Sequence, residues 1–213
     1  MKVILIAAGT ICGRISPAGF GSGLDRDFLE AARGESDASL MGAQTLRESD
    51  PEMKIAGVIP QKRIRAVISG SGDIPIDNRK LFAGKPLPVI FTGEKGSKRL
   101  EQNLAGRARI IILPEMDKGL SISRALDELR GLGAEKILIE GGGKLNYAAL
   151  KQGVVDEIYL TLAPYVSGDE NAASLADGPC PLGLSFMQLE LYSCEPQETG
   201  EVFLRYRVQK EKS

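Results

Sequence analysis

A run of three glycines behind a short apolar stretch is the part of this chain whose residue types best suit chemistry. Residues 136–139 have the length and apolar character of a buried strand, and Glu140 follows them directly before Gly141, Gly142 and Gly143. Glycines lack a Cβ and let a ligand approach the backbone, and a helix that begins at such a turn offers N–H groups to an anion. The stretch therefore indicates a phosphate or pyrophosphate site with a carboxylate beside it.

The glycine run also has a purely structural interpretation, because three glycines can simply make a tight turn between a strand and a helix. Neither of the usual phosphate-binding fingerprints, G-x-G-x-x-G and G-x-x-x-x-G-K-[ST], occurs in the chain. The glycines alone do not decide between the two interpretations.

The chain has no histidine, which excludes Ser-His-Asp and Cys-His hydrolases and the histidine-containing zinc deaminase site. The cysteines Cys12, Cys180 and Cys194 are odd in number and widely spaced, so we expect neither a disulfide framework nor a metal site. Cys12 is expected to be a small buried residue. A reaction whose difficult step is carried by an organic cofactor fits this inventory best.

The widely spaced cysteines indicate a reduced, cytoplasmic protein, and the composition limits its partners. With 213 residues, the chain suits one domain spanning residues 1–213. The 27 basic and 28 acidic residues give a net charge of −1, which argues against a nucleic-acid partner. No apolar run is long enough to cross a membrane.

Apolar runs that alternate with helical patterns predict an α/β fold with a mostly parallel sheet. Strands are expected at 2–8, 37–42, 65–68, 88–91, 109–113, 136–140 and 157–163, and a helix with an apolar stripe at 122–132. Asp25 is expected to cap a helix, and Asp50, before Pro51, to be extended. Residues 17–23 and 92–99 are expected to be loops. Segments 187–192 and 202–208 alternate with period two and predict an antiparallel hairpin.

Small and hydroxyl residues follow several of these strands. Ser69 to Gly72, Thr92 with Gly93, and Gly141 to Gly143 all come at expected carboxyl ends, which suits an extended ligand with more than one phosphate. The basic residues of 95–99 could contact a peripheral phosphate, such as the 2′-phosphate of NADP, or form an ordinary solvated loop.

Four segments resemble the reductases of riboflavin biosynthesis that act on ribosylaminopyrimidine 5′-phosphates, relatives of dihydrofolate reductase. The first is T-I-C-G-R-I at 10–15, and the second runs from S-D-A at 36–38 through Gly42 and Thr45 to D-P at 50–51. The third is I-E-G-G-G-K-L-N at 139–146, and the fourth is G-V-V-D-E at 153–157 with A-P at 163–164 and Gly168. Their order and spacing agree over nearly the whole chain. The resemblance implies a dihydrofolate reductase-like three-layer fold, with helices on both faces of the sheet and the hairpin at the C-terminus.

The resemblance also implies NADPH as cofactor and hydride transfer to C1′ of a ribosylamino group, which gives a ribitylamino product. Asp50 and Glu140 match carboxylates near the substrate, and one of them could relay a proton. A homodimer is the family expectation, through the C-terminal hairpin or the strand near 158–163. The residues that correspond to the cofactor site are Ala8, Gly42, Thr45, Ser69, Gly70, Thr92, Gly93, Gly141, Gly142, Gly143, Lys144 and Leu145.

Some positions depart from the family pattern. Cys12 and Ser49 replace aspartates, Ile6 replaces a common asparagine, and Ala56 with Gly57 occupy the region of a missing arginine. Loss of an arginine removes a bidentate phosphate partner. Two alternatives therefore stay open: a reductase of this fold that acts on another pterin, pyrimidine or small carbonyl compound, and a non-catalytic nucleotide-binding protein.

Overall fold

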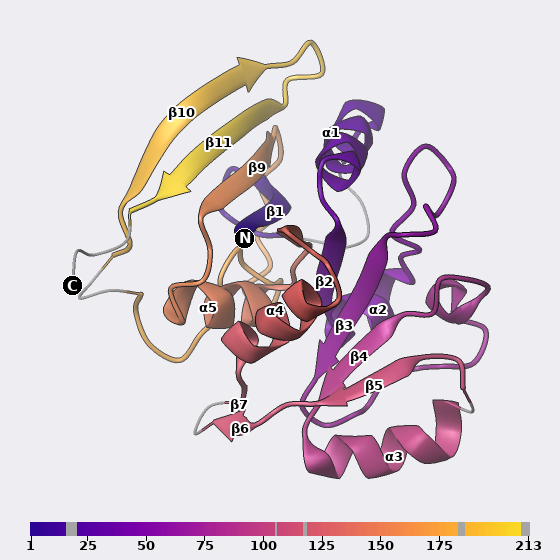
Figure 1. The fold of residues 1–213 in the computed structure, drawn as a ribbon. Helices are drawn as coiled ribbons and strands as arrows, with labels where there is room; N and C mark the ends of the chain where they lie inside the picture. The colour runs from indigo at the N-terminus through magenta and orange to yellow at the C-terminus, as the bar shows by residue number, and fades with distance from the viewer. Residues whose placement is uncertain (16–20, 105, 117–118, 183–185, 210–213) are drawn as a thin grey trace.

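The centre of the molecule is a nine-stranded sheet with strand order β10-β11-β9-β1-β8-β2-β3-β4-β5 (Figure 1). The structure is a computed structural model that describes residues 1–15, 21–104, 106–116, 119–182 and 186–209. Neighbouring strands from β9 to β5 are parallel, and β11 and β10 are antiparallel. The expected mostly parallel sheet and C-terminal hairpin are therefore confirmed.

The strands of this sheet are β1 (Lys2–Thr10), β2 (Ala38–Gly42), β3 (Ile64–Ser69), β4 (Val89–Thr92), β5 (Arg109–Ile112), β8 (Lys136–Ile139), β9 (Glu157–Ala163), β10 (Leu189–Pro196) and β11 (Val202–Val208). Two short strands, β6 (Glu115–Met116) and β7 (Gly119–Leu120), pair with each other in a separate sheet.

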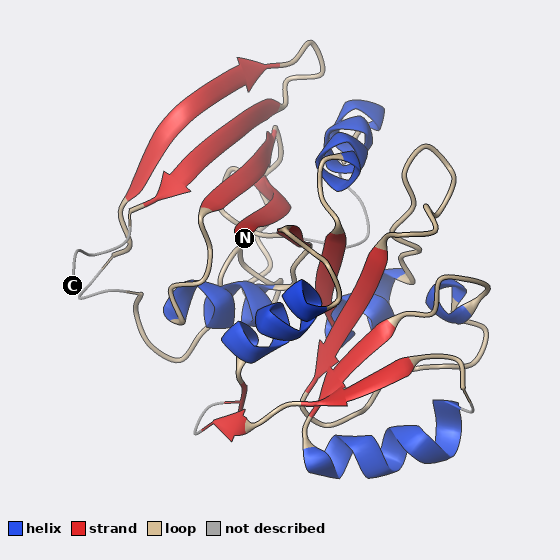
Figure 2. Cartoon of the chain, viewed as in Figure 1, coloured by secondary structure: helices blue, strands red, loops and turns tan. Residues whose placement is uncertain are grey.

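Helices cover both faces of the sheet (Figure 2). Alternation along β1 sends Val3 and Leu5 into a core shared with α4 and α5, and sends Ile4 and Ile6 into a core shared with α1. A further core on the α1 face holds side chains of α2 and α3. The helices are α1 (Gly23–Gly34), α2 (Ala43–Ser49), α3 (Glu94–Leu104), α4 (Ile122–Gly131) and α5 (Gly143–Lys151), with a 3₁₀ turn, η1 (Lys80–Phe82).

The apolar stripe expected at 122–132 is the buried face of α4. Ile122, Ala125, Leu126 and Leu129 are all buried, and burying each large side chain contributes about 1.5–3 kcal/mol. The helix begins at Ser121, whose hydroxyl accepts the Arg124 backbone N–H at 3.3 Å.

Three local predictions are wrong. Ser22, not Asp25, caps α1, and its Oγ accepts the Asp25 backbone N–H at 3.1 Å. Asp50 is left-handed (φ 44°, ψ 53°) because it terminates α2 and donates its N–H to the Leu46 carbonyl. Residues 94–99 belong to α3, because Leu100 and Leu104 bury one side of that segment. Most of the loop expected at 17–23 lies outside the described residues.

The loop after β3 and the first turn of α3 are in close backbone contact. A Cβ built on Gly96 would lie 2.8 Å from the Gly72 nitrogen and 3.1 Å from the Gly70 carbonyl oxygen. Gly72 itself has φ +66°, which favours glycine. This contact fixes the strand-end loop on α3. Within the described ranges, no helix has the length and apolar character needed to cross a membrane.

Candidate active site

A cavity of about 810 Å³ opens where β2, β3 and β8 end. These three strands are neighbours in the sheet and run parallel, so their carboxyl ends meet at one edge. The volume is within the range of small-molecule and cofactor sites. Most residues of the expected cofactor site line this cavity, namely Gly42, Thr45, Ser69, Gly70, Gly142, Gly143, Lys144 and Leu145.

The glycine turn is held in place by neighbouring backbone and by one hydroxyl. The Gly142 N–H donates to Thr45 Oγ1 at 3.1 Å, and the Gly42 N–H donates to the Gly141 carbonyl at 2.9 Å. A Cβ on Gly143 would overlap the Asp177 carboxylate, so only glycine fits there. Gly142 is the N-cap of α5 and provides no side-chain acceptor. The first turn of α5 therefore faces the cavity without a capping side chain.

The rest of the expected cofactor set does not line the cavity. Gly141 uses its carbonyl to bind Gly42. Thr92 is fully buried, and its Oγ1 has no hydrogen-bond partner among the described residues. Gly93 faces Glu115, whose Oε1 would be 2.5 Å from an added Cβ. Ala8 is half-buried within β1.

The basic residues of 95–99, which were candidates to contact a peripheral phosphate, do not contribute positive charge to the cavity lining. Lys95, Lys98 and Arg99 project from α3 and do not line the cavity, and Arg99 forms an exposed ion pair with Asp73 at 3.1 Å. Arg47 of α2 does line the cavity. Its Nη1 donates to the Asp73 carbonyl at 2.6 Å, which holds the guanidinium beside the loop that follows β3.

Glu140 is bound in a buried network on the α1 side of the sheet. Arg33, in the last turn of α1, donates through Nε to Glu140 Oε1 at 2.9 Å and through Nη2 to Oε2 at 2.6 Å. Such a bidentate pair is a strong, orienting contact. The Ser39 hydroxyl also donates to Oε1, and Arg63 Nη2 donates to Ser39 Oγ at 2.5 Å. The side chains of Arg33 and Glu140 are only 10% and 6% exposed.

The network sets the protonation state of Glu140. Burial alone would raise the pKa of this carboxyl, but the charge of Arg33 and the hydrogen bonds from Arg33 and Ser39 outweigh burial and hold the pKa below its usual range. Burial lowers the pKa of Arg63 to about 10, so this guanidinium is still charged at neutral pH. Glu140 is therefore an ionised hydrogen-bond acceptor.

Asp50 and Cys12 both lie outside the cavity lining. Asp50 Oδ1 accepts the Lys80 backbone N–H at 3.1 Å. Cys12 is exposed, so the expectation of a buried cysteine is wrong. It lies in the turn after β1, where its Sγ accepts the Ser167 N–H at 3.2 Å. The hydrogen bond with the Thr10 hydroxyl holds the pKa of the Cys12 thiol below its usual range.

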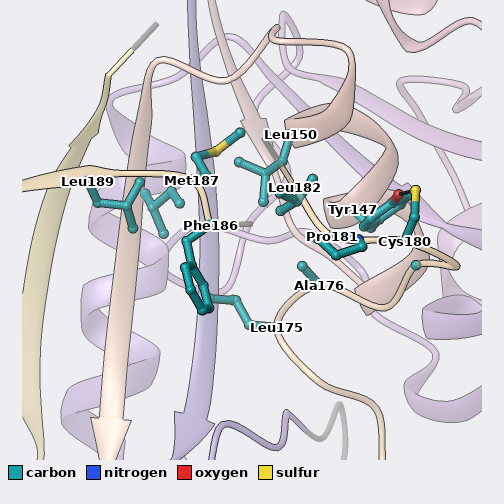
Figure 3. Close-up of a pocket in the computed structure, with 12 residues that line it drawn as sticks. Tyr147, Leu150, Leu175, Ala176, Cys180, Pro181, Leu182, Phe186, Met187 and Leu189 are labelled. Carbon is teal, nitrogen blue, oxygen red and sulfur yellow. Dashed lines mark hydrogen bonds between the residues drawn. The ribbon is translucent and has the colours of Figure 1, made fainter. Parts of the chain in front are cut away.

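A second cavity of about 320 Å³ lies between α5 and the start of β10 (Figure 3). Its lining is mostly apolar, and Phe186 at its edge is 90% exposed. Its polar groups include the Tyr147 hydroxyl and Cys180 Sγ, which are 2.9 Å apart. None of the expected site residues lines it.

The sheet order, the uncapped glycine turn and the strand-end cavity define an α/β protein with a small-molecule site at the carboxyl ends of its parallel strands. The chain belongs to the family of the RibD C-terminal domain, whose family model matches residues 1–202. It is 30% identical over 183 residues, 83% of each chain, to the 2,5-diamino-6-ribosylamino-4(3H)-pyrimidinone 5′-phosphate reductase of Methanothermobacter thermautotrophicus.

Solved structures show the same fold. A pyrimidine reductase-like protein from Corynebacterium diphtheriae matches with a TM-score of 0.77 at 22% identity, over 99% of this chain and 92% of that one. Dihydrofolate reductase from Enterococcus faecalis, complexed with NADP(H), matches with a TM-score of 0.54 at 12% identity, over 98% and 97% of the two chains. The expected dihydrofolate reductase-like fold is therefore confirmed.

Proposed function

We propose that this protein is an NADPH-dependent reductase that converts the ribosylamino group of a diaminopyrimidinone 5′-phosphate to a ribitylamino group in riboflavin biosynthesis. The observation that carries the proposal is the combination of RibD C-terminal family membership over residues 1–202 with a strand-end cavity lined by the expected glycine turn. NADPH, when bound, supplies the hydride that reaches C1′ of the sugar.

The described residues fit a dinucleotide. The first-turn N–H groups of α5 and the positive end of its dipole suit the pyrophosphate, and Lys144 adds a cation at the same turn. Ser69 and Gly70 offer a hydroxyl and open backbone along the neighbouring strand end. Arg47, held beside that loop, is the residue that we assign to the 2′-phosphate and hence to the preference for NADPH over NADH.

Glu140 is assigned to the substrate side of the reaction. A diaminopyrimidinone carries amino N–H donors, and an ionised carboxylate accepts such donors. A carboxylate has about four acceptor positions, of which Arg33 and Ser39 fill three. Oε2 accepts only from Arg33 and is therefore the oxygen that we assign to a substrate N–H. Asp50 is the second carboxylate that we assign near the substrate, at the end of α2.

The first experiment is a titration of the purified protein with NADPH and NADH in parallel, followed by NADPH oxidation with the pyrimidinone phosphate. We expect micromolar NADPH binding, much weaker NADH binding, and a ribitylamino product. Glu140→Gln should bind NADPH normally and turn over more slowly. Wild-type protein that binds neither nucleotide would contradict the assignment.

A change of substrate within the same fold is the second candidate. Where the family has an arginine after D-P-x-L, this chain has Ala56, which is left-handed (φ 47°) and donates its N–H to Glu30 Oε2 at 2.5 Å. This loop offers no guanidinium to the 5′-phosphate. Binding of NADPH without oxidation on the pyrimidinone phosphate, but with oxidation on its dephosphorylated or carbonyl analogues, would favour this candidate. Binding without turnover on any of them would favour a non-catalytic protein.

We also propose that the protein acts in the cytoplasm as a homodimer. Strand β9 pairs on both sides within the sheet, so it is not a free interface strand. Strand β10 is at the edge of the sheet, and its Leu191 is 49% exposed. Leu191→Lys should shift the mass measured by light scattering from dimer to monomer, whereas Ile112→Lys on the opposite edge strand should not. A monomeric wild type would contradict the proposal.

A further inference from the structure

The side chain of Ser39 can orient its hydroxyl proton in only one direction. Ser39 lies on β2, is fully buried, and contacts both Arg63 and Glu140. A guanidinium donates hydrogen bonds and accepts none, so Ser39 Oγ accepts from Arg63 Nη2. The single hydroxyl proton of Ser39 is then directed to Glu140 Oε1. The hydrogen bonds therefore run from Arg63 through Ser39 to the carboxylate.

Arg63 is itself fixed by the backbone at the end of α1. It is 4% exposed, and its Nη1 donates to the Arg33 carbonyl at 2.5 Å and to the Ser36 carbonyl at 2.8 Å. The same arginine thus contacts the backbone of Arg33, the residue that pairs with Glu140. A charged side chain this buried is costly unless it is paired. Both Nη atoms of Arg63 are hydrogen-bonded, whereas its Nε is buried with no partner among the described residues.

We propose that Ser39 and Arg63 are positioning residues for the reduction: together they hold Glu140 in one orientation, as an acceptor whose Oε2, bonded to Arg33 alone, keeps one acceptor position for a substrate N–H. Glu140 itself directly precedes the glycine turn and is not among the residues that line the cavity. This inference rests on the proposed function, since it assigns a role to Glu140 in that site. It also assigns Glu140 to accepting a substrate N–H and not to giving a proton to the substrate nitrogen, because an ionised carboxylate has no proton to donate.

The charged groups around Glu140 come from three parts of the chain. Arg33 faces it from α1 and Arg63 from the segment before β3, while Glu30 of α1 and Asp37 ahead of β2 act on those two arginines. Removal of the Ser39 hydroxyl leaves all four charges in place. Ser39→Ala therefore tests the hydroxyl alone.

A matched control is available at Ser36. This serine is also buried, and its Oγ also accepts a hydrogen bond from Arg63 Nη2, at 3.4 Å, but it donates to the Arg33 carbonyl at 3.1 Å and not to Glu140. Ser36→Ala removes a hydroxyl of the same size from the same arginine. Differences between the two variants therefore report on the contact with the carboxylate.

The experiment has two independent readouts. The first follows the Glu140 carboxyl carbon by NMR as pH falls, in wild type, Ser39→Ala and Ser36→Ala, without any substrate. We expect the midpoint of the Glu140 titration to move to higher pH in Ser39→Ala only, because only this variant loses a hydrogen bond to the carboxylate. An equal titration in all three proteins overturns the proposal, whatever the enzyme's activity.

The second readout is kcat/KM for the pyrimidinone phosphate across pH. We expect Ser39→Ala to lower kcat/KM about ten-fold or more, the usual effect of losing a hydrogen bond to a charged group. The acid limb of the pH profile, where activity falls as the carboxylate is protonated, should move to higher pH. NADPH binding should stay unchanged. Ser36→Ala should resemble wild type. If wild type shows no turnover, the proposed function fails, and the NMR titration still decides whether Ser39 orients Glu140. If Ser39→Ala turns over like Ser36→Ala, the positioning role is refuted.

Discussion

Replacing Arg33 by methionine should destabilise the protein strongly, in a way that depends on pH. The change leaves the Glu140 carboxylate buried without its two hydrogen bonds of 2.9 and 2.6 Å. Removing one partner of a buried pair costs about 3–5 kcal/mol of unfolding free energy. For a chain of this size each kcal/mol lowers the melting temperature by roughly 2–4 °C, so we expect a decrease of roughly 6–20 °C at pH 7.

The pH dependence follows from the pKa of Glu140. In the wild type this pKa is held below its usual range, so the stabilisation by the ionised carboxyl is present above the unfolded-state pKa of about 4.3 and is lost as pH falls through the folded-state value. In Arg33→Met, burial is expected to raise the folded-state pKa, and protonation then relieves the buried charge. The difference in stability between the two proteins should therefore shrink as pH falls below about 5.

Urea unfolding at several pH values measures this difference. The double variant Arg33→Met/Glu140→Gln should recover part of the loss, because no unpaired carboxylate is left buried. Arg124→Met is the matched control: Arg124 pairs with Asp127 at 3.8 Å with both side chains more than half exposed, and such pairs contribute about 0–1 kcal/mol. A loss in Arg33→Met no larger than in Arg124→Met at pH 7, or one that does not change with pH, would refute the reasoning.

Three further changes test other parts of the site. Gly142→Val adds a side chain whose Cβ lies 3.3 Å from Thr45 Oγ1. It should weaken NADPH binding, measured by calorimetry, at least ten-fold, while the circular dichroism spectrum stays the same. Normal NADPH binding would mean that the glycine turn has a purely structural role. Arg47→Gln should weaken NADPH more than NADH, and an equal loss for both nucleotides would exclude a 2′-phosphate contact. Gly96→Ala places its Cβ against Thr92 Oγ1 and 2.8 Å from the Gly72 nitrogen and should cost about 1–3 kcal/mol in urea unfolding. Unchanged stability would mean that both neighbours move aside freely.

The strands and the glycine turn could be predicted because their signals are local. An apolar run of strand length that ends in glycine, such as 136–143, determines its own conformation and its place at a strand end. Helix α3 was harder to predict, since only Leu100 and Leu104 mark its buried side among many charged residues. Asp50 was misassigned because its role in ending α2 outweighs the preference of a residue before proline.

The partners of Glu140 could not be predicted from the sequence. Arg33 is 107 residues away from it and Ser39 is 101 residues away, so no periodicity connects them. On its own helix, Arg33 has the position of an ordinary basic residue in a last turn, where the helix dipole favours a positive charge. Only the sheet order, which brings β8 beside β2, shows that the arginine and the carboxylate meet.

The position of β1 between β8 and β9 has a consequence for synthesis of the chain on the ribosome. Strands β2 to β5 pair in chain order, β2 with β3, β3 with β4 and β4 with β5, and can associate as they emerge. Strand β1 has no such partner, since Lys2 pairs with Lys136. At about 5–20 residues per second, the intervening chain takes roughly 7–27 s to make. During that time the apolar residues of β1 lack their strand partners, so this segment stays exposed to non-native contacts until β8 emerges.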